Sequence, residues 1–176
     1  LAETLLNRQI DFDFGDEALL ALHGQADHDV IRMNAQRYTV VLVPPMTTMR
    51  ASTLGLLHDF AMSGGTLLTV GTVPYLLDGE PSDTLEPFFE QYARRITSGI
   101  DLFDYGHVID TLDEWGCRAV RATTESDERP LGLLVTRRIW EDSELLFLMH
   151  QHSYTRTLQI ECVPKVTGRV ERWDYR

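Results

Sequence analysis

Few side chains in this sequence are of the types that do chemistry, and the first candidate follows an apolar strand. Residues 66–70 read as a buried strand, and Gly71, Thr72 and Val73 come directly after it. Hydrolases of parallel α/β architecture keep a serine or cysteine nucleophile at such a turn. Thr72 is the one hydroxyl there, and no base stands at a characteristic spacing from it. We therefore predict no catalytic residue, with a hydrolase that uses Thr72 as the least favoured reading.

Three residues are candidates for binding instead of catalysis. In an open parallel sheet, ligands bind beyond the carboxyl ends of the strands. Pro44 follows a predicted strand over residues 38–43, and Thr72 and Tyr75 follow the predicted strand over 66–70. We predict that these three residues border a cleft at this edge of the sheet.

Two further constellations have simpler explanations. Asp11 and Asp13 are a carboxylate pair of the kind used in glycoside hydrolysis, but an alternating strand needs a polar face in any case. His150 and His152 form a His-x-His pair, and Glu161 lies on the next predicted strand. Two imidazoles without a defined third ligand do not make a zinc site. We expect neither catalytic carboxylates nor a metal here.

Phosphate-bearing cofactors are disfavoured by the position of the glycines. A glycine-rich phosphate loop lies between a strand and the helix that follows it. Gly64 and Gly65 lie on the other side, after a helix, and Gly15 is followed by the acidic Asp16 and Glu17. We expect no cofactor.

The composition of the chain restricts the classes of partner that it can bind. The 176 residues carry 16 Lys and Arg against 27 Asp and Glu, a formal net charge of −11, which disfavours nucleic acid. No apolar run is long enough to cross a membrane. Cys117 and Cys162 are too few for a disulfide framework, although a single bridge between them stays open.

The elements that would position these residues form two parts. Residues 1–116 contain helices over 1–8, 16–22, 48–62 and 83–97, with strands over 10–14, 30–33, 38–43 and 66–70. The run 38–70 predicts a strand–helix–strand unit with parallel strands. Residues 117–176 predict strands over 117–123, 131–140, 144–149 and 157–163, joined by turns. The expected fold is an α/β domain with a flavodoxin-like or class I amidotransferase-like parallel sheet, followed by an antiparallel β-rich segment.

The motifs of the first part carry a family resemblance: the alternation at 10–14, the Tyr-x-x-apolar-apolar-Pro pattern of 38–44, Gly-Gly before the strand at 66–70, and Gly-Thr-Val-Pro at 71–74. The sequence resembles the glutamine-amidotransferase-like, or β-galactosidase trimerisation-like, accessory domain of large bacterial glycoside hydrolases related to α-L-rhamnosidases. In such enzymes the catalytic carboxylates lie in a separate barrel, so the resemblance implies no catalytic residue in this chain.

The resemblance implies a non-catalytic accessory domain that packs against a catalytic barrel, shapes its cleft or mediates oligomer contacts. Its partners would be other domains of the parent chain, with carbohydrate and a second copy as further candidates. The first residue, Leu1, and the β-like last residues suggest a piece of a longer chain. The alternative is a free-standing flavodoxin-like module that binds a small molecule. The sequence predicts no compartment.

Overall fold

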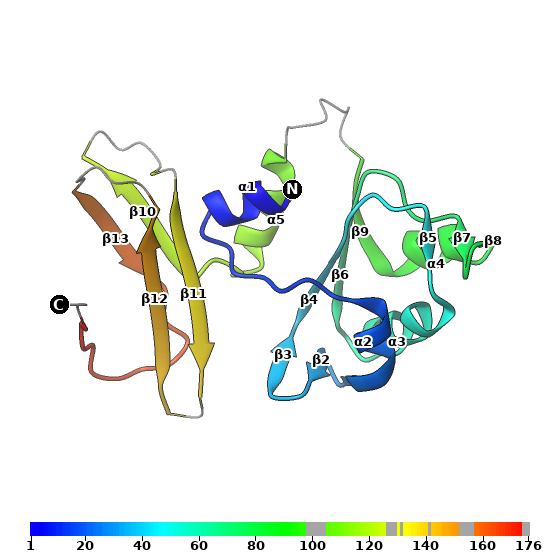
Figure 1. Cartoon of the computed structure of the whole chain (residues 1–176), viewed down its shortest axis with the longest axis horizontal. Helices are drawn as coiled ribbons and strands as arrows, with labels where there is room; N and C mark the ends of the chain where they lie inside the picture. Colours follow the sequence, from blue (N-terminus) through cyan, green and yellow to red (C-terminus); the bar gives the residue numbers. More distant parts are fainter. Residues whose placement is uncertain (98–104, 126–129, 131, 141, 152–156, 174–176) are drawn as a thin grey trace. The chain divides into compact units, whose positions relative to one another are not determined.

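The computed structural model describes residues 1–97, 105–125, 130, 132–140, 142–151 and 157–173 (Figure 1). The fold is mixed α/β, with one parallel three-stranded sheet, flanking helices and several antiparallel sheets. The chain divides into two compact units. The central unit is Asp13–Val108, and the terminal unit combines Leu1–Phe12 with Ile109–Arg176.

The central unit begins with a short capped helix and ends within a helix shared by both units. Its elements are α2 (Glu17–His23), β1 (Gly24–Asp27), β2 (Val30–Met33), β3 (Gln36–Tyr38), β4 (Val40–Val43), β5 (Thr48–Met49), α3 (Ala51–Met62), β6 (Thr66–Val70), β7 (Leu76–Leu77), β8 (Glu80–Pro81), α4 (Leu85–Tyr92), β9 (Ala93–Ile96) and the start of α5 (Gly106–Glu114).

The parallel sheet has the strand order β4-β6-β9, and both pairings are parallel. The predicted strand–helix–strand unit is thereby confirmed, since α3 connects β4 to β6 and packs against β6. The central strand of this sheet is β6. Leu67 and Leu68 of β6 are fully buried, as a strand covered on both faces requires.

Two glycines and one aspartate fix the local connections in this unit. Asp16 caps α2, because its Oδ1 accepts hydrogen bonds of 2.9 Å from the backbone N–H groups of Ala18 and Leu19. Gly64 follows α3 with a φ of 99°, a left-handed conformation that suits glycine. A Cβ atom at Gly65 would overlap the ring of Phe60, so this turn requires a glycine.

Small antiparallel strands complete the central unit. β1, β2 and β3 form a meander that contacts α2 and α3. A second small sheet has the order β5-β7-β8 and mixes a parallel with an antiparallel pairing. The core between these elements and the parallel sheet is apolar, and its most buried members are Phe60, Leu67, Leu85 and Phe89.

The terminal unit consists of helices and two antiparallel strand pairs. Its elements are α1 (Ala2–Asn7), most of α5, β10 (Val120–Thr124), β11 (Leu133–Ile139), β12 (Glu144–His150) and β13 (Leu158–Cys162). β11 pairs with β12 and β10 pairs with β13, so the predicted antiparallel character of this segment is confirmed (Figure 1). The two pairs share a small apolar core of Ala119, Val120, Ala122, Leu133 and Val135.

Two sequence expectations differ from the structure. Residues 10–14 were expected as a half-buried strand, but they form no strand, and Phe14 is 83% exposed while Ile10 is buried. The cause lies in their partners, because Ile10 belongs to the terminal unit and Phe14 to the central one. A helix was expected to continue to residue 97, yet α4 ends at Tyr92 and the next four residues form the third parallel strand, β9.

The sequence divided the chain at 1–116 and 117–176, whereas the compact units group Leu1–Phe12 with the C-terminal strands. Helix α1 packs against β11, and Gln9 donates a hydrogen bond of 3.4 Å to the carbonyl of Leu133. Gly99 and His152, together with residues 126–129 between two predicted strands, lie outside the described residues.

Candidate functional site

An open hollow lies at the carboxyl edge of the parallel sheet, where an α/β sheet normally binds its ligand. Its volume is about 570 Å³, within the range of small-molecule sites. The segments after β4 and β6 form part of its wall, and β9 and α4 supply the charged side chains. The lining residues, which define the hollow, are Pro45, Met46, Thr47, Thr72, Val73, Tyr75, Glu86 and Arg95.

Two of the three residues predicted for this cleft line the hollow. Thr72 and Tyr75 are among its lining residues, and both are exposed. Pro44 is exposed and is not among them, while its neighbour Pro45 takes the corresponding place after β4. The structure therefore places Thr72 and Tyr75 in the lining of one hollow and leaves Pro44 outside it, next to Pro45 in the chain.

The turn after β6 is held in place by its glycine. Gly71 has a φ of 70°, and its N–H donates a hydrogen bond of 2.9 Å to the carbonyl of Ile96, the last residue of β9. A Cβ atom at Gly71 would lie 3.2 Å from Cγ of Pro45, a close approach that glycine relieves. This turn therefore presents Thr72 against the segment that follows β4.

Tyr75 is fixed by its backbone and free at its ring. Its N–H donates a hydrogen bond of 3.1 Å to the carbonyl of Thr47, and its own carbonyl accepts one of 3.0 Å from the N–H of Ser82. The residue is nevertheless 62% exposed, so its ring remains largely accessible. The result is an aromatic surface whose position costs little further ordering on binding.

Arg95 and Glu86 supply the charge of the hollow. Nη1 of Arg95 donates a hydrogen bond of 2.7 Å to Oε1 of Glu86 and lies 3.9 Å from Oε1 of Glu90. Arg95 is the more buried partner, with its side chain 25% exposed against 52% for Glu86. Among the described residues, the guanidinium of Arg95 thus lies beside the carboxylates of Glu86 and Glu90.

Sequence reasoning did not single out Glu86 and Arg95. Both residues fall within the helix expected over residues 83–97, which the structure divides into α4 and β9. The missed signal was the recurrence of a β-like run about one crossover length after β6, which indicates a third parallel strand. Arg95 lies near the carboxyl end of that strand, and this places it in the hollow.

The remaining carboxylate and histidine candidates do not form a site together in the described part of the chain. Oδ2 of Asp11 accepts a hydrogen bond of 2.8 Å from the backbone N–H of Arg137, and Oδ2 of Asp13 accepts one of 2.6 Å from the hydroxyl of Tyr38. Glu161 is exposed on β13, opposite Arg121. Among the residues described, no group of three His, Cys, Asp or Glu side chains is arranged to hold a metal ion.

The two cysteines are free thiols in the terminal unit. Cys162 is exposed, and Cys117 is half-buried. Burial raises the pKa of the Cys117 thiol, an effect that nearby Lys165 opposes and Asp113 adds to. Beside it, burial lowers the pKa of Arg118, while the ion pair of 2.8 Å with Asp113 counteracts the shift. The pKa shifts of Cys117 and Arg118 therefore follow from burial and from their charged neighbours in the fold.

The outer face of β12 carries a row of exposed apolar side chains, which we call the apolar strip. Leu146 packs against the small core, so its neighbours on either side point to the opposite face of the strand. The apolar strip consists of Leu145, Phe147 and Met149, which are 43%, 60% and 44% exposed. Trp140, at the end of β11, is 55% exposed.

Comparisons with family models, with curated proteins and with solved structures found no match to this chain. In the described part of the chain, no helix combines the length and the apolar character needed to cross a bilayer.

Proposed function

We propose that this chain is a non-catalytic accessory module of a multidomain glycoside hydrolase, which packs against another domain of the parent protein. The observation that carries the proposal is the apolar strip of Leu145, Phe147 and Met149 on β12. Contiguous exposed apolar side chains mark surfaces that another protein surface covers. A half-exposed Phe and two long aliphatic side chains on one strand are such a surface.

The pairing of the strands adds to this argument. On β11, Arg138 and Thr136 pair with Leu145 and Phe147, so polar side chains flank two of the strip residues, while Leu134 pairs with Met149 and extends the apolar row. Interfaces between domains commonly combine an apolar centre with a polar border. The strip therefore favours a specific contact over a general hydrophobic surface.

The class of parent protein rests on the family resemblance of the central unit and on its nucleophile slot. The turn after β6 holds Gly71, Thr72 and Val73, with no serine or cysteine. Two charged side chains line the hollow together with Thr72. They are Glu86 and Arg95, and they are paired with each other. This arrangement supports a binding or packing role, with the reaction carried out by another domain.

Side-chain footprinting of methionines tests the packing role. Met149 of the apolar strip is 44% exposed, and Met62 at the end of α3 is 62% exposed. Oxidative labelling is compared between this chain and the product of the complete open reading frame that encodes it. We expect Met149 to be labelled in this chain and protected in the complete product, while Met62 serves as the control for labelling efficiency.

Equal labelling of Met149 in both proteins would contradict the packing role. The non-catalytic part of the proposal has a separate test, incubation of this chain with a panel of aryl glycosides. Turnover of about 1 s⁻¹ or faster, a rate typical of enzymes, would overturn it.

The hollow favours a second candidate, a free-standing flavodoxin-like module that binds a small molecule. Its volume of about 570 Å³ is sufficient for such a ligand. Native mass spectrometry of the purified chain tests this candidate. A co-purified small molecule would support it, and a bare chain mass would count against it.

A further inference from the structure

The hollow combines three kinds of group that recognise one chemical class of ligand. The first is the ring of Tyr75, which is exposed while its backbone is held by Thr47 and Ser82. An exposed aromatic face on an anchored backbone packs well against a ligand with an apolar C–H face. Tyr75 is the aromatic residue among the described residues of the lining, and its ring would stack on one face of a ligand.

The second kind of group is the ion pair of Arg95 and Glu86. A guanidinium has five N–H donors, and the polar contacts of Arg95 with described residues run through Nη1. Glu86 contributes carboxylate oxygens that accept hydrogen bonds. The pair therefore offers donors and acceptors at a fixed separation. A ligand with vicinal hydroxyl groups, each both donor and acceptor, can use both members.

The third kind of group is neutral and surrounds this pair. The side chains of Thr47 and Thr72 bring hydroxyls, and those of Met46 and Val73 bring apolar surface. A mixed lining of this kind suits a ligand that is apolar on one face and hydroxylated at its edges.

Electrostatics decide between neutral and anionic ligands. Glu86 and Glu90 both lie within 4.0 Å of the Arg95 guanidinium, at 2.7 and 3.9 Å, so two carboxylates oppose one cation. The whole chain carries a net charge of −11. An incoming phosphate, sulfate or uronate would meet an unfavourable potential. The hollow therefore disfavours an anionic ligand.

We propose that the hollow binds a neutral saccharide, with one sugar ring stacked on Tyr75 and its hydroxyl groups bonded to Arg95 and Glu86. This inference deepens the proposed function, since an accessory module that holds glycan would assist a glycoside hydrolase. The saccharide is either a free sugar or the end of a glycan chain, and both present the same ring chemistry.

The experiment is a titration of the chain with saccharide probes, and binding is measured by ligand-observed NMR and by calorimetry. The probes are methyl glycosides of neutral hexoses and pentoses, neutral xylo-, gluco- and galacto-oligosaccharides, oligogalacturonate of matched length, and adenosine. We expect at least one neutral probe to bind with a Kd of about 0.1–5 mM, as an open hollow allows. Equal affinities for a methyl glycoside and its oligosaccharide would indicate recognition of a single ring, whereas tighter oligosaccharide binding would indicate a glycan chain.

Variants link the binding to the hollow. Tyr75→Ala removes the stacking surface and should weaken binding about tenfold or more, while Tyr75→Phe should stay within about threefold. Arg95→Gln should weaken it as well. The matched control is Trp140→Ala, which removes another exposed aromatic ring, in the terminal unit, and should leave the affinity unchanged. Circular dichroism confirms that each variant is folded.

Three results would overturn the inference: no neutral probe binding at about 10 mM, oligogalacturonate or adenosine binding more tightly than every neutral sugar, or an unchanged affinity in Tyr75→Ala. Binding should also be insensitive to salt, because a neutral ligand is not screened. Failure here leaves the protection of Met149 unaffected, so the packing role and the saccharide site are tested separately.

Discussion

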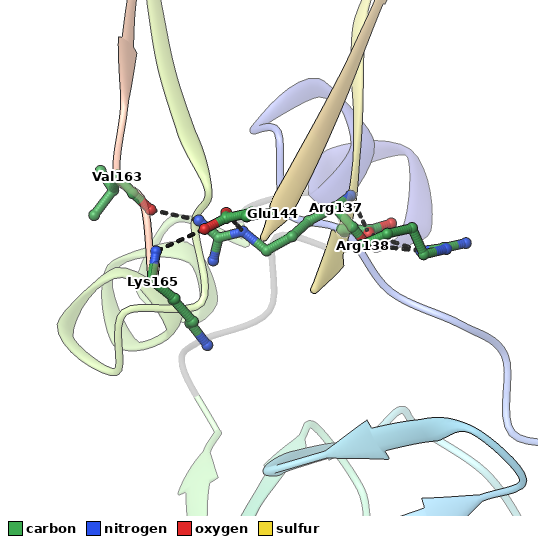
Figure 2. Close-up of polar contacts among 6 residues, drawn as sticks. Arg137, Arg138, Glu144, Val163 and Lys165 are labelled. Carbon is green, nitrogen blue, oxygen red and sulfur yellow. Dashed lines mark hydrogen bonds and ion pairs between the residues drawn. The ribbon is translucent and has the colours of Figure 1, made fainter. Parts of the chain in front are cut away.

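Nε of Arg137 lies 2.7 Å from Oε1 of Glu144, and the two side chains are 10% and 6% exposed. Arg137 is near the end of β11 and Glu144 is the first residue of β12, so the pair links the two strands close to their turn (Figure 2). The other carboxylate oxygen of Glu144 accepts a hydrogen bond of 2.7 Å from the N–H of Lys165, and Nη2 of Arg137 donates to the carbonyl of Val163. One ion pair therefore joins the hairpin to the segment after β13.

Removal of one member of this pair should strongly destabilise the terminal unit. Glu144→Ala leaves a buried guanidinium without its carboxylate, which typically costs about 3–5 kcal/mol in the free energy of unfolding. The measurement is urea denaturation followed by circular dichroism. The double variant Arg137→Met with Glu144→Leu should cost less than the single change, because neither charge is then left uncompensated.

The control for this prediction is an exposed ion pair in the same unit. Arg169 and Glu171 lie 3.6 Å apart with side chains 87% and 53% exposed. Exposed pairs contribute about 0–1 kcal/mol, so Glu171→Ala should hardly move the denaturation midpoint. Similar losses in the two alanine variants would show that burial of the Arg137–Glu144 pair has no energetic consequence.

The glycines of the segment α3–β6 should respond in opposite directions to alanine. Gly65→Ala forces a Cβ atom into the ring of Phe60, which is fully buried, and should destabilise the chain by about 1–3 kcal/mol. A Cβ atom at Gly55, within α3, meets nothing within 4 Å, so Gly55→Ala should stabilise the helix by about 0.5–1 kcal/mol. Thermal unfolding of both variants checks the signs, and a stable Gly65→Ala protein would refute the packing of Phe60 described here.

The cap of α2 should be measurable by itself. Asp16→Ala removes the acceptor for two backbone N–H groups and should cost about 0.5–2 kcal/mol. Asp16→Asn keeps a side-chain oxygen and should retain most of the stability. Chemical denaturation of the two variants measures their free energies of unfolding. Equal stability of the alanine variant and the parent chain would mean that the cap contributes nothing.

The half-buried thiol of Cys117 should make the stability of the folded chain fall at high pH. Burial raises the pKa of Cys117 above its usual value of 9.0, so the thiol ionises earlier in the unfolded chain than in the folded one. Its contribution is complete below that value and is lost as the pH rises toward the folded pKa. Unfolding measured between about pH 8 and pH 10.5 should show this decline, and Cys117→Ala should reduce its slope.

A thiol reagent distinguishes the two cysteines directly. Cys162 is exposed, whereas Cys117 is half-buried with a raised pKa. Because thiolates are the reactive species, an aromatic disulfide reagent at about pH 8 should modify Cys162 first. Cys162→Ala should remove the fast phase, and faster modification of Cys117 would contradict its burial.

Local signals in the sequence predicted much of the secondary structure. The apolar runs correctly indicated β6, β11, β12 and β13, and the helix expected over residues 16–22 corresponds to α2. These features depend on neighbouring residues, which a sequence displays. The expected strand over 10–14 was wrong because Ile10 and Phe14 belong to different units, and no local pattern encodes this division.

The hollow was predicted in part for a similar reason. Thr72 and Tyr75 follow a recognisable strand, and strand ends can be read from the sequence. The sequence did not indicate that Arg95 lies on a strand, because α4 continues directly into β9 without a glycine or proline between them. Its pairing with Glu86 depends on the packing of the third strand, which becomes visible once the sheet order is known.

The grouping of Leu1–Phe12 with Ile109–Arg176 has a consequence for the order of events during synthesis. Helix α1 is synthesised more than a hundred residues before β11, the strand that it packs against. The ninety-six residues of the central unit lie between these two partners, so residues 1–12 remain without β11 until the central unit has been synthesised. Translation pauses after residue 108 would therefore prolong a half-finished state in which Leu5 and Ile10 are still exposed to chaperones.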